Sequence, residues 1–177
     1  MTIYTVGHST RALEDLVEML RAHGVAQLAD VRTVPKSRRY PHFAGEALAR
    51  SLADNGIVYR HLPALGGLRK PRPDSKNTAW RVEGFRGFAD YMETSGFECA
   101  LEELMAWAAA ADAAEERSTT VMCAEAVWWR CHRRLIADAL VVHGVEVRHI
   151  SSKTSAPVHT LTPFARLTDQ RLAYSGR

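Results

Sequence analysis

The residues best suited to chemistry lie between positions 119 and 134. An apolar run ends at Cys123, and a cation-rich amphipathic segment begins near Arg130 after a short loop. A cysteine between a strand end and a helix start lies near the positive end of the helix dipole, and nearby arginines add to that field. Both effects favour the thiolate, the nucleophilic form of cysteine. Cys123 is therefore the candidate nucleophile. The alternative is a small buried side chain at the end of a core strand.

Cysteine-dependent phosphatases and sulfurtransferases hold a nucleophilic cysteine on such a loop, where backbone N–H groups and an arginine bind the anion. In this chain the spacing from Cys123 to Arg130 is one residue longer than the phosphatase Cys-x5-Arg pattern. The loop also has no glycine, and it carries Glu125, a carboxylate that would repel an anionic substrate. The match to phosphatases is therefore weak.

Three further residues are candidates for proton transfer or for orienting a neighbour. His8 follows the first predicted strand and is a candidate general base, with a structural hydrogen bond as the alternative. Glu125 is a candidate general acid or base, or a partner for Arg133. Asp30 and Arg32 alternate along one predicted strand, so their side chains share a face. They form either a buried ion pair or an aspartate that orients a base beside an arginine that holds an anion.

Four arginines are candidate anion-binding residues: Arg32, Arg39, Arg130 and Arg133. A metal site is an alternative use of the cysteine segment, because zinc and iron accept thiolate and imidazole ligands. Its ligands would be Cys123, Cys131 and His132, although Cys-x7-Cys-His is not a recognised zinc spacing. Our first interpretation therefore assigns no metal ligands, and these three residues are the alternative. The cofactor is left unknown, with a zinc or iron ion as the candidate.

Two segments, residues 33–43 and 68–76, concentrate cations. The first carries Lys36, Arg38, Arg39 and His42, with no acid and with aromatic residues between them; the second carries four cations against one aspartate. Such runs are commonly solvated surface charge, but cations interleaved with aromatics also suit phosphates and unstacked bases.

The elements that must position these residues follow from apolar runs and glycines. Strands are predicted at residues 3–7, 27–32, 57–62, 119–123 and 145–150. Helices are predicted between residues 13 and 24 and at 46–55, 85–92, 97–114 and 130–143. This alternation predicts one three-layer α/β domain over residues 1–150, with a mostly parallel sheet of about five strands flanked by helices. Residues 151–177 are expected to form a C-terminal tail that packs on the domain or extends from it, with a short helix near Phe164.

Polar residues follow all five predicted strands. They are His8 and Ser9, then Asp30 and Arg32, then His61, then Cys123 and Glu125, then Ser151 and Ser152. Ligands of open parallel sheets bind beyond the carboxyl ends of the strands. We therefore expect these groups to share one rim.

Size and composition exclude several classes of protein. The chain has 177 residues, 46% hydrophobic and 24% charged, with a formal net charge of +3. These values are typical of one globular domain. No apolar run approaches the ~18 residues of a membrane span, and the N-terminus lacks the pattern of a signal peptide. Three cysteines cannot all pair, so we expect a cytoplasmic protein without a disulfide framework and without membrane contact.

The ordered motifs of the chain resemble the domain-of-unknown-function family 488, from Ile3 to about Ile150. The motifs are Thr5-Val6-Gly7-His8-Ser9-Thr10, Asp30-Val31-Arg32-Thr33-Val34-Pro35, Ser37-Arg38-Arg39, Leu62-Pro63 with Leu65-Gly66-Gly67, Phe88-Ala89-Asp90-Tyr91-Met92, Cys123-Ala124-Glu125 and Cys131-His132-Arg133. Many members have a proline between Glu125 and Cys131, where this chain has Ala-Val-Trp-Trp. The resemblance implies an α/β domain and a shared polar set: His8, Asp30, Arg32, Cys123, Glu125, Cys131, His132 and Arg133. It implies no reaction.

Taken together, the residues favour a cytoplasmic α/β enzyme acting on an anionic, phosphorylated or nucleotide-like substrate. A cysteine-dependent hydrolase or transferase is the reaction class, with Cys123 as nucleophile. The alternatives are a nucleic-acid-binding module, suggested by the two basic segments, and a Cys/His metal-binding protein. The expected partner is thus an anionic small molecule or a nucleic acid. The sequence leaves open the oligomeric state and whether residues 63–83 close over the site.

Overall fold

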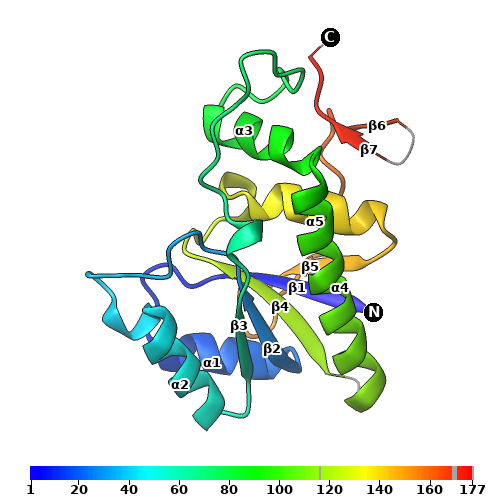
Figure 1. Ribbon diagram of the computed structural model, residues 1–177. Coiled ribbons are helices and arrows are strands. Elements are labelled where there is room, and N and C mark those ends of the chain that lie inside the picture. The colour runs from blue at the N-terminus through cyan, green and yellow to red at the C-terminus, as the bar shows by residue number, and fades with distance from the viewer. Residues whose placement is uncertain (116, 169–170, 177) are drawn as a thin grey trace.

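A computed structural model describes residues 1–115, 117–168 and 171–176 of the chain (Figure 1). Its centre is a five-stranded sheet of β1 (Thr2–Gly7), β2 (Val25–Asp30), β3 (Val58–His61), β4 (Ser118–Cys123) and β5 (Glu146–His149). The strand order is β3-β2-β4-β1-β5, and every neighbouring pair is parallel. The predicted α/β class with a parallel sheet of five strands is confirmed.

Helices cover both faces of the sheet, which gives three layers (Figure 1). On one face lie α1 (Leu13–Ala22) and α2 (Gly45–Asp54), whose apolar residues form one core with the sheet. On the other face lie α3 (Glu83–Met92), α4 (Ser95–Glu115) and α5 (Arg133–Val142), which form a second, larger core. The central strands β1, β2 and β4 are mostly buried, whereas the edge strands β3 and β5 keep exposed positions.

Glycines end the helices that feed β2, β3 and β5, as the sequence predicts. Gly24, Gly56 and Gly144 have φ values of +66°, +73° and +78°, in the left-handed region that suits glycine after a helix. The strands that follow therefore start at defined points, and their carboxyl ends meet at one edge of the sheet. None of the described helices is both long enough and apolar enough to cross a membrane.

Long connections leave the carboxyl ends of β2, β3 and β4. Each contains a short 3-10 helix: η1 (Pro41–Phe43), η2 (Pro63–Leu65) and η3 (Trp128–Arg130). These connections carry most of the candidate residues, so the sheet positions them through its strand ends.

The C-terminal segment crosses the α5 side of the domain and ends in a hairpin of β6 (Arg166–Thr168) and β7 (Arg171–Ala173). The short helix predicted near Phe164 is wrong: Ala165 N–H donates to the Thr162 carbonyl in a single turn. The Phe164 ring packs instead against Trp80, with ring centroids 4.8 Å apart. Side-chain packing and the backbone bonds of Thr162 thus replace the helix.

A buried chain of hydrogen bonds joins this segment to β1, β5 and α5. Asp138 accepts hydrogen bonds from His159 Nε2 (2.8 Å), from the Thr162 N–H (2.9 Å) and from the Tyr174 hydroxyl (2.8 Å). Because His159 donates through Nε2, its Nδ1 accepts from His149 Nε2 at 2.9 Å. His149 Nδ1 in turn accepts from the Thr5 hydroxyl at 2.7 Å. Thr5, His149, His159 and Asp138 thus form one continuous buried chain of hydrogen bonds.

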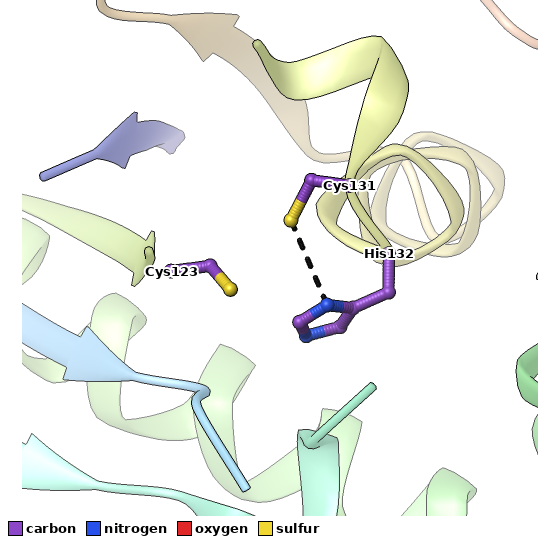
Figure 2. A group of neighbouring side chains, drawn as sticks. All are labelled: Cys123, Cys131 and His132. Atoms are coloured by element: carbon purple, nitrogen blue, oxygen red, sulfur yellow. Dashed lines mark hydrogen bonds between the residues drawn. The ribbon is translucent and has the colours of Figure 1, made fainter. Parts of the chain in front are cut away.

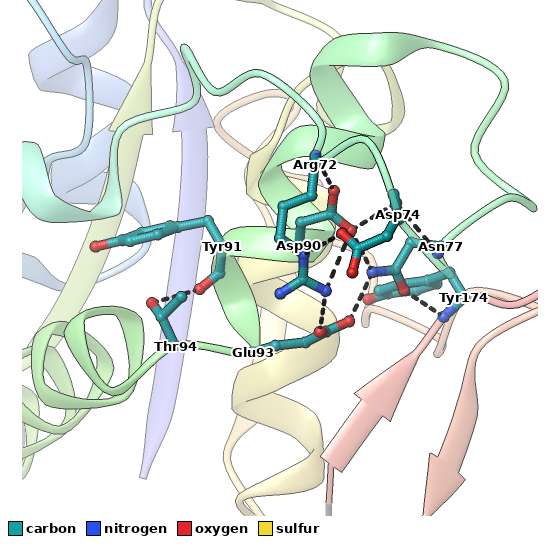
Figure 3. Close-up of polar contacts among 9 residues, drawn as sticks. Arg72, Asp74, Asn77, Asp90, Tyr91, Glu93, Thr94 and Tyr174 are labelled. Atoms are coloured by element: carbon teal, nitrogen blue, oxygen red, sulfur yellow. Dashed lines mark hydrogen bonds and ion pairs between the residues drawn. The ribbon is translucent and has the colours of Figure 1, made fainter.

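A second polar network fixes the segment between η2 and α3 (Figure 3). Asp90 on α3 accepts hydrogen bonds from the Arg72 N–H, the Ser75 hydroxyl and the Asn77 amide, at 2.6 to 2.8 Å. The side-chain amide oxygen of Asn77, Oδ1, accepts a hydrogen bond from the Tyr174 backbone N–H at 2.9 Å. Residues 72–77 are therefore fixed on one side by Asp90 of α3 and on the other by Tyr174, which directly follows β7.

Replacing Asp138 with Asn should destabilise the protein by roughly 2–4 kcal/mol, because an amide donor would then face buried donors. Chemical denaturation followed by circular dichroism measures the change. Asp54→Asn, an exposed change at the end of α2, is the matched control and should be nearly neutral. Equal stability of the two variants would contradict the conclusion that Asp138 holds the C-terminal segment on α5 through these hydrogen bonds.

Stability should also fall as pH falls below about 6.5. Burial lowers the pKa of His8 to about 4 and that of His149 to about 3. The unfolded chain then binds protons that the folded chain does not, at up to about 1.4 kcal/mol per pH unit for each histidine. Denaturation at several pH values between 7 and 5 measures the slope. His8→Gln should reduce it, whereas His143→Gln, at an exposed position, should not.

Candidate functional site

A cavity of about 810 Å³ opens at the carboxyl edge of the sheet. Its lining residues fall within five stretches: 8–10 after β1, 32–40 after β2, 67–68 and 82–85 on either side of the segment 72–77, and 123–132 after β4. Four of the five expected strand ends or their connections thus border one space, as ligand sites of parallel sheets do. The β5 end does not contribute: Ser151 and Ser152 bond to Ser155 and do not line the cavity.

The charge of the cavity lining is mainly positive. Four of its residues are cations: Arg32, Lys36, Arg39 and Arg130. Glu125 is the one carboxylate among the described residues that line it. The hydroxyls of Ser9, Thr10, Thr33 and Ser37 also border the space. The cavity is therefore suited to an anion with several oxygen acceptors.

Gly7 lets the loop after β4 approach the end of β1. A Cβ atom at Gly7 would lie 2.0 Å from the carbonyl oxygen of Glu125, so no larger residue fits without moving the loop. The two segments are also joined by backbone hydrogen bonds: His8 N–H to the Cys123 carbonyl at 3.0 Å and Ser9 N–H to the Ala124 carbonyl at 2.9 Å. Ser9 adopts a φ of +48°, an uncommon backbone state for a residue with a side chain.

Asp30 fixes Arg32 at the wall of the cavity. Arg32 Nε and Nη2 donate to the two carboxylate oxygens of Asp30 at 2.9 and 2.5 Å, and the Tyr59 hydroxyl donates to the same carboxylate at 2.8 Å. Arg32 Nη1 donates to His8 Nε2 at 3.3 Å. The His61 ring donates to the Arg32 carbonyl at 2.8 Å. The guanidinium is thus oriented by a buried carboxylate before any ligand binds.

His8 is neutral at physiological pH. Its Nδ1–H donates to the Ser9 carbonyl at 3.0 Å, which leaves Nε2 as the acceptor for Arg32. Its ring stacks on Phe43, with centroids 4.2 Å apart. Burial lowers the pKa of His8 to about 4, and the charge of Arg32 acts in the same direction. His8 therefore holds Arg32 and is poorly suited to accept a further proton.

Two cysteines and a histidine meet at the cavity wall (Figure 2). The Sγ atoms of Cys123 and Cys131 and a ring nitrogen of His132 all lie within 4.8 Å of one another. His132 Nδ1 lies 3.6 Å from Cys131 Sγ, and His132 Nε2 is buried without a hydrogen-bond partner. Cys123 ends β4 and Cys131 precedes α5, so the sheet and the helix bring the two thiols together.

Arg133 contacts the Cys131 sulfur from the protein interior. It is 1% exposed, and its Nε donates to Cys131 Sγ at 3.4 Å, while Nη2 donates to the Glu125 carbonyl. Among the described residues Arg133 forms no ion pair with a carboxylate. A buried guanidinium needs a counter-charge, and the sulfur of Cys131 is the atom in place to provide it.

The two thiols therefore differ in acidity. The neighbouring Cys123 thiol, followed by His132 and Arg133, lowers the pKa of Cys131 against the opposing effect of burial. The neighbouring Cys131 sulfur and burial raise the pKa of Cys123. The contact with Arg133 therefore favours Cys131 as the more acidic of the two thiols.

A metal ion is the alternative occupant of this cluster. The three side chains offer two sulfurs and one nitrogen, a set that zinc accepts at a three-ligand site. A metal would, however, place a second cation beside the buried guanidinium of Arg133, 3.4 Å from the same sulfur. The donor set therefore fits a metal, while the surrounding charge favours a thiolate paired with arginine.

Most of the predicted site residues lie together. His8, Arg32, Arg39, Cys123, Glu125, Arg130, Cys131 and His132 all line the cavity. Asp30 and Arg133 do not: Asp30 supports Arg32, and Arg133 supports Cys131 from the protein interior. Arg133 was expected to contact an anion directly, but it does not line the cavity. His61 also lies outside it and supports the backbone of Arg32.

Sequence reasoning missed two features. It proposed Cys123 as the activated thiol and did not consider the contact of Arg133 with the Cys131 sulfur, for which the i+2 spacing was the available signal. It also considered His132 as a possible metal ligand. The unpartnered Nε2 depends on packing around the ring, and no sequence pattern reports it.

The comparison with protein families gives one result. The family model described as Domain of unknown function DUF488 matches residues 12–140, which is more than half of the chain, so the chain belongs to this family. The matched range contains Asp30, Arg32, Cys123 and Cys131 but begins after His8. No curated protein and no solved structure is similar enough to match.

Cys131 should react with iodoacetamide at about pH 6, well below the usual thiol pKa of about 8.5, whereas Cys123 should not. Peptide mass spectrometry after timed alkylation resolves the three cysteines. Exposed Cys99 is the internal control and should react only near its ordinary pKa. A chelator should leave the Cys131 rate unchanged. Faster alkylation of Cys123 at this pH, or a rate that rises on chelation, would contradict the thiolate–guanidinium pair.

Proposed function

We propose that this member of the DUF488 family is a cysteine-dependent transferase or hydrolase that acts on a small anionic substrate. One observation carries the proposal: a cysteine sulfur that accepts a hydrogen bond from a buried guanidinium borders a cavity with four cations and one carboxylate. A thiolate is a strong nucleophile, and the cations would draw an anion toward it. The cavity volume of about 810 Å³ is within the range of ligand sites and exceeds the need of a single phosphate, which supports a nucleotide-like or similarly large substrate.

Cys131 is the nucleophile in this proposal, and Cys123 lies beside it as the second thiol. The Cys123 thiol, the His132 ring and Arg133 would stabilise the charge of Cys131 before substrate binds. The helix that follows, α5, begins at Arg133, so its N-terminal dipole also favours the thiolate.

Proton transfer falls to His132 or Glu125. His132 Nδ1 contacts Cys131 Sγ, and its buried Nε2 has no hydrogen-bond partner and so is free to exchange a proton with a ligand. Glu125 is exposed at the cavity rim, where its carboxylate accepts from the Val127 N–H at 3.3 Å. His8 is instead a positioning residue for Arg32, because Arg32 already occupies its Nε2.

Anion binding falls to Arg32, Arg39 and Arg130, with Lys36 beside them. Arg32 is fixed by Asp30, whereas Arg39 and Arg130 are exposed and can adjust to a ligand. A cytoplasmic location is part of the proposal, because three free cysteines suit a reducing compartment.

A nucleic-acid-binding module is the second candidate. Lys36, Arg38 and Arg39 are exposed on the segment that borders the cavity, and the Arg39 guanidinium lies 5.6 Å from the Tyr40 ring centroid. Cations beside an aromatic ring suit a single strand. If this candidate holds, oligonucleotides bind at ~50 mM salt and lose affinity steeply as salt rises.

Substituting Arg39 or Arg130 with Ala should weaken binding of pyrophosphate or AMP by about tenfold, the equivalent of one lost charge-assisted contact. Isothermal titration calorimetry measures the affinity. Arg50→Ala, an exposed change on α2 away from the cavity, is the matched control and should bind normally. If neither ligand binds the wild type, or if all three variants bind alike, the anion site is not where we propose.

A further inference from the structure

We propose that Cys123 and Cys131 act together as a dithiol that exchanges with a small anionic disulfide and closes into an intramolecular disulfide. This rests on the proposed function for its cavity and names a substrate class for it. The observations that carry the proposal are the meeting of two thiols at one wall and the cationic lining around them. A single nucleophilic cysteine would need no second thiol beside it.

The two sulfurs are placed to reach one another. They lie within 4.8 Å, and a disulfide bond requires about 2.05 Å. Cys123 is the last residue of β4, and Cys131 follows η3 with extended backbone angles of −124° (φ) and 150° (ψ). Residues 124–127 between them belong to no helix or strand. The sulfurs can therefore close the remaining gap by side-chain rotation and loop adjustment, without breaking the sheet or α5.

The first step uses the thiolate of Cys131. Its sulfur attacks one sulfur of the incoming disulfide, the disulfide bond of that molecule breaks, and one thiolate leaves. Cys131 is then joined to the other half of the molecule in a mixed disulfide. Exchange of this kind proceeds through such an intermediate.

The second step uses Cys123. Its thiol gives its proton to the departed thiolate, and its sulfur attacks Cys131 Sγ. The bond between Cys131 and the bound half breaks, and the second thiolate leaves. The two protein sulfurs lose two electrons in total, and the small disulfide gains them and becomes one thiol and one thiolate.

The cavity charge selects the disulfide. Arg32, Lys36, Arg39 and Arg130 border the space in front of the two thiols, against Glu125 alone. A disulfide with carboxylates on both halves would be attracted, whereas an uncharged one would not. Because Arg39 and Arg130 are exposed, this attraction should weaken as salt rises.

Oxidised glutathione is the anionic probe, and 2-hydroxyethyl disulfide is the uncharged one. The full-length protein is treated with each at low salt, quenched with acid, alkylated and analysed by peptide mass spectrometry. We expect a Cys123–Cys131 bridge with Cys99 still reduced, formed about tenfold faster with oxidised glutathione. Cys123→Ser should accumulate a glutathione adduct on Cys131. Cys131→Ser should react far more slowly, and Cys99→Ser should behave as the wild type.

Three outcomes overturn the proposal or part of it. A lasting adduct on wild-type Cys131, or no oxidation by either probe, overturns the dithiol. Such a result leaves the anion binding of the proposed function intact, since calorimetry with AMP tests that separately. Equal rates with the two probes overturn the anionic substrate class while the dithiol stands. Thermal unfolding of each variant shows that it is folded, so a negative result is informative.

Discussion

The buried guanidinium of Arg133 is the constraint on which the site depends. It is 1% exposed and reaches a backbone carbonyl and a sulfur, with no carboxylate paired to it among the described residues. A cation in that position is tolerable only beside an anion. The Cys131 sulfur is placed to meet this need, so the folded structure would stabilise a thiolate there before any substrate binds. The contact between the Arg133 guanidinium and the Cys131 sulfur favours both the acidity of the thiol and the burial of the arginine.

At the end of the neighbouring strand β2, the structure repeats this arrangement with the charges exchanged. There a buried carboxylate, Asp30, holds a guanidinium that faces the cavity, and His8 completes its hydrogen bonds. The end of β4 and the start of α5 thus present a sulfur contacted by an arginine, and the end of β2 presents an arginine held by an aspartate. Gly7 allows the loop after β4 to touch the end of β1. The fold therefore prepares both a nucleophile and an anion site.

The sequence predicts the parts of this arrangement that depend on local pattern. Apolar runs and the glycines at 24, 56 and 144 locate the strands, and the parallel alternation then brings His8, Arg32 and Cys123 to one edge. The acidity of the thiols could not be predicted, since it follows from which sulfur contacts Arg133 at 3.4 Å. The chain of His149, His159 and Asp138 was also missed, because its members are distant in sequence and meet only when the C-terminal segment packs on α5. The helix expected near Phe164 failed for the same reason: long-range packing overrides local preference.

Trp128 lies between the two cysteines in the chain and stacks on His149, with ring centroids 3.9 Å apart and planes 7° apart. One face of the indole is therefore fixed to the buried histidine chain, while its backbone belongs to the loop that carries the thiols. The chain contains its own optical probe of the site. Any change that moves the loop alters the contact between indole and imidazole, so the contribution of Trp128 to the fluorescence of the four tryptophans would respond to the state of the cavity.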